Sequence, residues 1–316
     1  MFVLFATSAS AFYHPHEEKS FLGWMRESNQ LFTGEDYHSR FGIWMSNNRL
    51  VQEHNAGQTD FTISMNHLSH LTPSEYRSML GFKPTLKNRI AKRTDFIANE
   101  AVDWRQKGIV NPIKDQTPDC GSCWAFSTCQ AQESQWAKTH GTLYRLSESN
   151  LVDCVKTCGG CDGGVMDAAY DYVIKYQDGM FMKEEDYPYV PRQGACKFDK
   201  KKGTTKVTGY MNVVEGSEED LASKISQYGV AAIAIDASHW SFQLYHGGIY
   251  DEKSCSPQEL DHAVGCVGYG SENGKDFWIV RNSWGEGWGE KGYIRMVKGK
   301  GNQCGEASYA MIPIDA

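Results

Sequence analysis

Two cysteines three residues apart are the first groups in this chain that could do chemistry. Cys120 and Cys123 lie in the run CGSCWAFS, and Cys123 is followed directly by an apolar segment. A thiolate is a nucleophile, a metal ligand and a redox group. The pair is therefore consistent with a redox motif, with half of a metal site, or with a structural cysteine beside a catalytic one.

The redox and metal interpretations lack the sequence context that each needs. A thioredoxin-like CxxC motif belongs in a βαβ setting, which the surrounding pattern does not offer. A zinc site would use the three cysteines of segment 154–161, but no second cluster of Cys or His lies at a typical spacing. A nucleophilic Cys123 needs a base and a group that orients that base. His262 is the candidate for the base, and Asn282 is the candidate for the orienting group. The sequence favours a catalytic cysteine, and no metal or other cofactor is expected.

A helix is expected to position the nucleophile. Ser122 is a good N-cap residue, and the pattern from Cys123 onward predicts a helix that ends at Gly141. The sulfur of Cys123 would then lie at a helix N-terminus. The partial positive charge there favours the thiolate, so we expect a pKa below the ordinary value of about 8.5.

Strands are expected to position the base and its partner. Helical patterns come early in the chain and strand patterns come late, which suggests an α+β fold with a helical half facing a sheet half. The late strands are predicted at 261–270, 276–284 and 292–297, and the first two are joined by a turn at Asn273-Gly274.

Composition limits the class of protein. The 316 residues are 41% hydrophobic, which suffices for one large core or two moderate ones. A net charge of -7 with no basic patch argues against a nucleic-acid partner. No apolar stretch approaches the roughly 20 residues that span a bilayer, so no membrane partner is expected.

The first residues resemble a secretory signal. A short apolar run ends in Ala9-Ser10-Ala11, an A-x-A cleavage pattern, so residues 1–11 are interpreted as a signal peptide rather than a disordered terminus. Ten cysteines agree with an oxidising compartment. We expect the secretory pathway, with an acidic lysosome-like vesicle or the exterior as destination.

The segment before residue 95 has a different character from the rest and holds no cysteine. Spacings of three and four residues predict one face of a long helix that ends at Gly57, followed by a strand with Phe61 and Ile63 on its buried side. Thr72-Pro73-Ser74-Glu75 reads as a capping box that opens a second helix, and the basic run 81–96 reads as an extended linker. The face of the long helix consists of Asp36, Arg40, Trp44, Asn47, Val51 and Asn55.

The chain resembles the papain family in its cathepsin L-like branch over nearly its whole length. The motifs that carry the resemblance are CGSCWAFS, VDWRQKGIVNPIKDQ, LSESNLVDC, CDGGVMDAAYDYV, DHAVGCVGYG and WIVRNSWGEGWGEKGYIRM, and the helical face resembles the family's inhibitory propeptide helix. The resemblance implies a papain-like two-domain fold: a helical domain and an antiparallel, barrel-like β domain, with the active-site cleft between them. The implied parts are a mainly helical propeptide at 12–97 and a mature enzyme at 98–316, with halves of roughly 105–208 and 209–316.

The resemblance also implies roles for the reactive residues. Cys123 would be the nucleophile, His262 its base and acid, and Asn282 the group that orients the imidazole. Trp284 would shield that hydrogen bond from water, and the Gln116 side chain would join the Cys123 backbone N–H in an oxyanion hole. The implied activity is that of a cysteine endopeptidase made as a zymogen, because no loop that would block the cleft follows Cys161.

The implied partners are protein and peptide substrates, the chain's own propeptide and cystatin-like inhibitors, and the implied state is a monomer. The second substrate pocket would have apolar walls with no carboxylate at its base unless Glu306 turns inward, so it should prefer a bulky apolar side chain. The substrate-binding residues implied by the resemblance are Gly163, Gly164, Val165, Met166, Ala234, Leu260, Asp261, Ala263 and Tyr309.

The family pattern implies the disulfides Cys120–Cys161, Cys154–Cys196 and Cys255–Cys304. Cys266, on a predicted strand, is expected to be a buried free thiol. For Cys129 and Cys158 both a further bridge and two free thiols remain open. Two interpretations from other classes also remain: a catalytically silent papain-like binding protein and a thiol-disulfide oxidoreductase.

Two departures from the family pattern bear on function. Thr117-Pro118-Asp119 makes the loop after Gln116 one residue longer than usual, and the loop lacks its glycine. In the propeptide strand motif, the usual acidic residue is replaced by His70. Because a histidine packed against the enzyme must be charged in a poorly solvated place, we hypothesise that acid loosens the propeptide through His70, together with His67. The alternative that these histidines are solvated and that acid acts only through carboxylates stays open.

Overall fold

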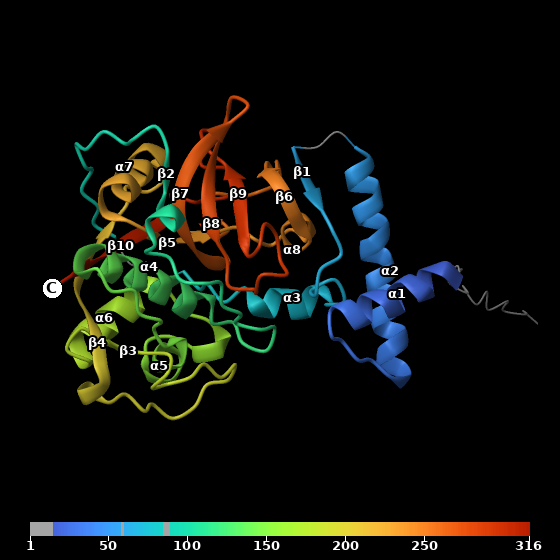
Figure 1. The fold of residues 1–316 in the computed structure, drawn as a ribbon, viewed down its shortest axis with the longest axis horizontal. Helices are drawn as coiled ribbons and strands as arrows, with labels where there is room; N and C mark the ends of the chain where they lie inside the picture. Colours follow the sequence, from blue (N-terminus) through green and yellow to red (C-terminus); the bar gives the residue numbers. More distant parts are fainter. Residues whose placement is uncertain (1–14, 58–59, 85–88) are drawn as a thin grey trace, which may run out of the picture.

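The structure is a computed structural model that describes residues 15–57, 60–84 and 89–316, and its fold is α+β (Figure 1). The segment 1–11 interpreted as a signal peptide lies outside the described residues. No helix in the described ranges is long and apolar enough to cross a membrane. The α-helices are α1 (Pro15–Glu27), α2 (Gly34–Ala56), α3 (Pro73–Met79), α4 (Cys123–His140), α5 (Glu148–Cys154), α6 (Met166–Tyr176), α7 (Glu218–Tyr228) and α8 (Trp240–Gln243).

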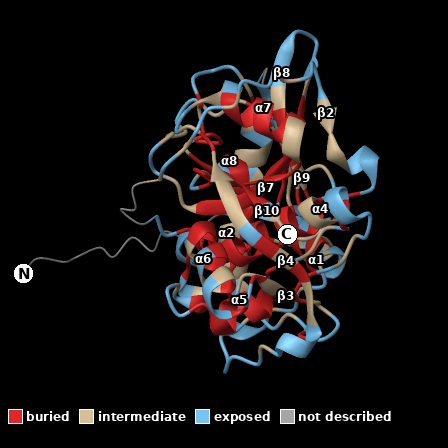
Figure 2. Ribbon diagram, turned by 90° about the vertical axis from the view of Figure 1, so that its left-hand side faces the viewer, coloured by how far each residue is buried: buried red, intermediate tan, exposed pale blue. Residues whose placement is uncertain are grey.

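The strands form one long, twisted set of pairings, in which β7 and β10 run through the buried centre of the molecule (Figure 2). The order is β1-β6-β9-β8-β7-β5-β10-β4-β3, and β2 pairs with β7. The strands are β1 (Phe61–Ile63), β2 (Val102–Asp103), β3 (Met180–Met182), β4 (Gly203–Asn212), β5 (Ala231–Ile235), β6 (Tyr245–Tyr250), β7 (His262–Glu272), β8 (Lys275–Arg281), β9 (Tyr293–Val297) and β10 (Tyr309–Asp315).

The α+β prediction is confirmed, with two differences in detail. Among the described residues no pairing joins the two ends of the strand order, so the sheet is open rather than a closed barrel. The β6–β9 pair is parallel, whereas the other pairs are antiparallel. The turn predicted at Asn273-Gly274 does connect β7 and β8, and both residues have the positive φ that such a turn requires.

Helix α4 is the central element of the helical half. It begins at Cys123 and ends before Gly141, as the sequence predicts, and Gly141 adopts the left-handed conformation of a C-cap. The helix is largely buried because it packs against α5 and α6 on one side and against β7 and β10 on the other. One detail differs: the Ser122 hydroxyl pairs with that of Tyr189 at 2.7 Å and does not cap the helix.

The first part of the chain has a small core of its own and lies against one end of the sheet (Figure 1). Its predicted long helix is α2, which ends at Gly57, and the capping box of Thr72 and Glu75 opens α3. The core between α1 and α2 consists of Phe21, Trp24, Met25, Phe41, Trp44 and Met45.

The first part is attached to the sheet half by backbone pairing. Strand β1 adds an antiparallel edge strand to β6. A second contact lies on α8, where the Asn66 amide donates to the Gln243 carbonyl and the Gln243 amide donates to the Leu68 carbonyl, both at 2.8 Å. The strand pairing and the two hydrogen bonds to main-chain carbonyls fix the path of the first part along the sheet half, toward the helical half.

The predicted helical face of α2 holds the segment that follows it. Asn55 exchanges two hydrogen bonds with Ile63, at 2.7 and 3.1 Å, and the Asn47 amide donates to the Ser69 carbonyl at 2.8 Å. Arg40 binds Glu75 through two nitrogens, at 2.5 and 2.7 Å, which ties α2 to α3. The remaining members of the face are Asp36, which pairs with Arg40, Trp44, which is buried, and Val51, which packs against the sheet core.

Candidate active site

Cys123 lies at the N-terminal end of α4, in the boundary between the two halves. Its side chain is completely buried, and its sulfur accepts a hydrogen bond from the Ala263 N–H at 3.4 Å. Ala263 is the second residue of β7, so the strand that carries His262 lies directly against the cysteine. The tertiary structure thus brings together two residues that are 139 positions apart in sequence.

The His262 ring is hydrogen-bonded to the side chain of Asn282, the residue that follows β8. The distance between His262 Nε2 and Asn282 Oδ1 is 2.8 Å. The same Oδ1 accepts from the Ser283 N–H at 2.8 Å. Because a backbone N–H can only donate, the shared atom is an oxygen, and the Nε2 of His262 must therefore carry the proton. The bare nitrogen is Nδ1, which is buried and has no hydrogen-bond partner within the described part of the chain.

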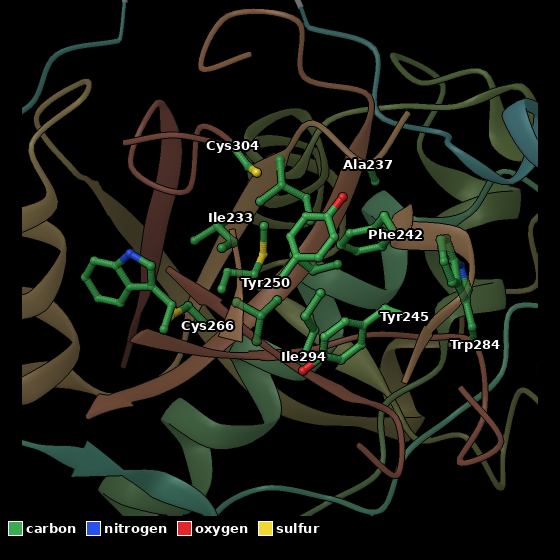
Figure 3. Packing of buried hydrophobic residues seen from close by; sticks show 14 of the residues in the cluster. Ile233, Ala237, Phe242, Tyr245, Tyr250, Cys266, Trp284, Ile294 and Cys304 are labelled. Carbon is green, nitrogen blue, oxygen red and sulfur yellow. The ribbon is translucent and has the colours of Figure 1, made fainter. Parts of the chain in front are cut away.

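Aromatic rings enclose this histidine. The Trp284 ring lies 4.8 Å from the His262 ring, centroid to centroid, and is itself fully buried. Phe242 packs perpendicular to Trp284 at 5.6 Å, and Figure 3 shows both at one end of the packed cluster of the sheet half. A buried ring packed against the imidazole keeps water from the hydrogen bond between His262 and Asn282, which strengthens that bond.

Gln116 is held rigidly by Ser283. The Ser283 hydroxyl donates to Gln116 Oε1 at 2.7 Å, and the Gln116 N–H donates to the Ser283 carbonyl at 2.8 Å. The side-chain nitrogen Nε2 of Gln116 donates to the carbonyls of Met79 at 3.0 Å and Cys120 at 3.1 Å. Sequence reasoning did not identify Ser283; its position next to Asn282 was the only available signal.

The longer loop after Gln116 contains a tight turn at Thr117. Thr117 takes a left-handed conformation with φ of 60°, unusual for a β-branched residue, and its N–H donates to Asp115 at 2.8 Å. The extra residue therefore produces a local turn, while the bonds of Gln116 to Ser283 fix the side chain beside Cys120.

Burial sets the charge states of the reactive pair. It raises the pKa of Cys123 to about 12, although the N–H groups of Ala263 and Gly81 oppose the rise. It lowers the pKa of His262 to about 4, against the effect of the bond to Asn282. The expectation of a lowered cysteine pKa is wrong for this form of the chain, because desolvation outweighs the helix N-terminus. The pair is neutral here.

The segment after α3 causes this burial. Gly81 passes directly over the loop of Cys120 and Cys123: a Cβ on Gly81 would lie only 1.8 Å from the Gly121 carbonyl oxygen. Only glycine permits so close an approach of two backbones. Beyond it, the Phe82 N–H donates to the Asp261 carbonyl at 3.0 Å. The Lys83 N–H donates to the Gly164 carbonyl at 3.1 Å, and the Gly164 N–H donates to the Gly81 carbonyl at 2.9 Å.

Phe82 lies against residues that are expected from the sequence to line the second pocket. Its ring is buried within one apolar cluster and meets the Tyr309 ring edge-on at 4.9 Å. Four more of the residues expected to line the pocket belong to the same cluster: Val165, Met166, Ala234 and Ala263. Leu260 packs against the cluster, and Gly163 lies beneath Gly81 and Lys83.

A carboxylate that the sequence did not indicate lies behind this pocket. The Tyr309 hydroxyl donates to Asp167 Oδ1 at 2.8 Å, and Asp167 is buried. Glu306 does not turn into the pocket; it is fully buried elsewhere, where burial and the charge of Glu218 raise its pKa. The available signal was that Asp167 directly follows Met166.

The cysteines form the three bridges of the family pattern: Cys120–Cys161, Cys154–Cys196 and Cys255–Cys304. Cys123, Cys129, Cys158 and Cys266 are free thiols, so Cys129 and Cys158 do not form a fourth bridge. Cys120 is therefore structural and is not available as the redox partner of Cys123. The bridges also occupy Cys154 and Cys161, two of the three thiolates that the zinc interpretation needs.

Comparison with known proteins agrees with this geometry. Residues 98–314 match the papain family cysteine protease domain, and residues 21–76 match the cathepsin propeptide inhibitor domain. The fold and the site thus define a cysteine protease joined to its own inhibitory segment. The chain belongs to the papain family and is a cathepsin L-like cysteine protease zymogen.

Relatives of the same kind cover almost the whole chain. The cathepsin L-like proteinase of Fasciola hepatica is 39% identical over 93% of this chain and 92% of its own length. Cathepsin L2 of Homo sapiens is 37% identical over 99% of this chain and 97% of its own. The structure of digestive procathepsin L 3 from Tenebrio molitor larval midgut superposes with a TM-score of 0.87 at 36% identity, over 94% of this chain and 98% of that chain.

Proposed function

We propose that the zymogen gives rise to an endopeptidase in which Cys123 attacks the peptide carbonyl and His262 transfers the proton. The observation that carries the proposal is the chain of contacts from the Cys123 sulfur through Ala263 and His262 to Asn282, which lies at the boundary of the two halves. Peptides are the substrate class, and the chain's own first part is the inhibitor.

The reaction follows from the groups in place. When the cleft is open to water and substrate, the proton of the Cys123 thiol passes to Nδ1 of His262 and the thiolate forms a bond to the carbonyl carbon. The Cys123 N–H and the Gln116 amide stabilise the oxyanion. The imidazolium then donates its proton to the leaving amine, which breaks the peptide bond and leaves a thioester. Water, activated by the same imidazole, hydrolyses the thioester and restores the thiol.

The preferred substrate has a bulky apolar residue in the second pocket. The packing of Phe82 among Val165, Met166 and Tyr309 supports this preference, because a Phe, Leu or Val side chain would meet the same apolar atoms. We place the end of the propeptide near residue 97 and the start of the mature enzyme at 98. The mature halves are assigned as roughly 105–208 and 209–316. Cleavage near Lys92 and Arg93, which are exposed, would separate the parts.

The surroundings in which it acts follow from the same features. Three disulfides suit an oxidising compartment, so we assign the chain to the secretory pathway, with residues 1–11 as its signal and an acidic vesicle or the exterior as its destination. We infer a monomer that cystatin-like inhibitors can block once the cleft is open.

The test is a nucleophile replacement. Cys123→Ser should leave a folded zymogen that neither processes itself at acid pH nor hydrolyses peptides, and His262→Ala should behave in nearly the same way, with losses of several orders of magnitude. An active-site thiol epoxide should label the acid-processed native enzyme once, at Cys123. Labelling at Cys120 would instead support a thiol-disulfide oxidoreductase, and activity in Cys123→Ser above a trace would refute the assignment.

A further inference from the structure

The linker residue Arg89 is seated in a formed site on the mature enzyme. Its guanidinium carbon lies 3.8 Å from the centroid of the Tyr309 ring. Its Nη2 donates to the Ser308 carbonyl oxygen. A cation over the face of a tyrosine, with a carbonyl as hydrogen-bond acceptor, is a favourable arrangement for a guanidinium.

The charges around this site favour a cation. The Tyr309 hydroxyl donates a hydrogen bond to the buried Asp167, which places a carboxylate at the hydroxyl end of the ring. Burial lowers the pKa of Arg89, while Tyr309, Glu215 and Asp167 act in the opposite direction. The cost of removing water from Arg89 is therefore opposed by the ring and by two carboxylates, Glu215 and Asp167.

The Tyr309 ring separates two different environments. Phe82 meets the ring edge-on within the apolar second pocket, at an interplanar angle of 74°. Arg89 covers the face of the same ring. Once the linker is removed, both positions become open to a peptide substrate. One of them suits an apolar side chain and the other a cation.

We propose that the Arg89 position is a subsite for a cationic side chain of the substrate, formed by Tyr309, the Ser308 carbonyl and Asp167. This inference rests on the proposed function. The part of the substrate that follows the second-pocket residue toward the C-terminus runs to the peptide bond attacked by Cys123. The subsite is therefore reached from the amino side, by an arginine or lysine upstream of the apolar residue.

The first experiment compares arginine with citrulline, its neutral isostere. Each peptide has phenylalanine for the second pocket and either arginine or citrulline at one of the positions upstream of it. The acid-processed enzyme is assayed with each peptide. At one position kcat/KM should be about 3- to 30-fold higher for arginine, the range expected for a cation over an aromatic ring. Equal values at every upstream position would overturn the subsite. Failure to cleave either peptide would instead contradict the proposed endopeptidase.

Variants assign the preference to the named groups. Tyr309→Leu should bring the ratio of arginine to citrulline close to one, whereas Tyr309→Phe should retain the part due to the ring. Asp167→Asn should reduce the ratio. The ratio within one enzyme is insensitive to general losses of activity. An unchanged ratio in Tyr309→Leu would overturn the proposal.

A second measurement needs no catalysis and uses the zymogen with Cys123→Ser. Arg89→Gln should lower its melting temperature in the presence of Tyr309 and should have little further effect in Tyr309→Leu, because the two residues interact directly. Additive effects of the two substitutions would contradict a site built on Tyr309. Arg93→Gln is the matched control, since Arg93 pairs with Glu219 at the surface.

Discussion

The side-chain amide of Gln116 donates to the carbonyl oxygen of Met79 at 3.0 Å, so a main-chain carbonyl of the first part takes the hydrogen bond proposed for the oxyanion. The chain continues through Gly81, whose N–H donates to the same Met79 carbonyl at 3.0 Å and whose backbone lies over Gly121. A peptide carbonyl thus lies at the proposed catalytic donor, and the segment that follows it pairs Phe82 with Gly164 in the parallel direction. Inhibition follows from occupation of the site by the first part.

The first prediction concerns this donor. Gln116→Ala should lower kcat of the processed enzyme by roughly ten- to a thousand-fold, the range for loss of one oxyanion donor, with a smaller change in KM. Ser283→Ala should give a weaker loss of the same kind, because it frees the Gln116 side chain to rotate. Steady-state kinetics with one peptide substrate measures both. A loss below about threefold in Gln116→Ala would mean that another group stabilises the oxyanion.

The second prediction concerns the reactivity of Cys123 before and after processing. With its pKa near 12 in the zymogen, Cys123 carries almost no thiolate at neutral pH and is covered by Gly81. Iodoacetamide should therefore modify it at least a hundredfold more slowly in the zymogen than in the processed enzyme. Peptide mapping by mass spectrometry separates this signal from Cys158, the partly exposed free thiol. Equal rates would show that the first part does not control the thiol.

The third prediction assigns part of the acid response to His70. This residue is buried between the rings of Trp24 and Phe32, and burial, followed by the charge of Arg40, lowers its pKa to about 4. In the open form His70 binds a proton below about pH 6.5, whereas in the closed form it stays neutral until about pH 4. The closed form therefore loses stability as the pH falls through this window, by about tenfold per pH unit.

His70→Asn removes the titrating group, so autoprocessing should begin at lower pH. Glu75 also titrates near this site: Arg40 lowers its pKa to about 2, so its contribution is lost only between about pH 4.5 and 2. His67, whose pKa is lowered by burial and raised by Asp115, is the other titrating neighbour. His38→Asn on the exposed face of α2 is the control. A processing profile identical to the native one would leave the carboxylates as the trigger.

The fourth prediction concerns Glu306 and stability at neutral pH. Glu306 is fully buried, both of its oxygens lack hydrogen-bond partners in the described part of the chain, and burial raises its pKa to about 8. The folded state must hold a proton that the unfolded state releases above pH 4.5. Stability is therefore lost as the pH rises from 4.5 to 8, on the order of 3 kcal/mol at pH 7.

Glu306→Gln cannot ionise, so its stability should depend less on pH. Melting temperatures of the Cys123→Ser zymogen with and without Glu306→Gln should converge at pH 4.5 and diverge in favour of glutamine at pH 7.5. Glu259→Gln, at an exposed position, is the matched control for the loss of a surface carboxylate. Parallel curves for the Glu306→Gln variant would show that Glu306 is not protonated in the folded protein.

Local patterns sufficed to predict much of this molecule. The capping box at Thr72, the stop at Gly57, the helix from Cys123 to Gly141 and the turn at Asn273-Gly274 each depend on a few adjacent residues, and each occurs as predicted. The residue types Cys, His and Asn likewise indicated thiol chemistry, because few other uses require that combination.

Only the tertiary structure decided the state of the site. Whether Cys123 is a thiolate or a thiol depends on solvation, and the backbone at Gly81, 42 residues away in sequence, excludes water from it. The carboxylate of Asp167 behind Tyr309 and the bond from Ser283 to Gln116 join residues more than 140 positions apart. Burial and charge act through space, so the sequence determines which groups are present, while their ionisation and their partners are fixed by how the chain packs.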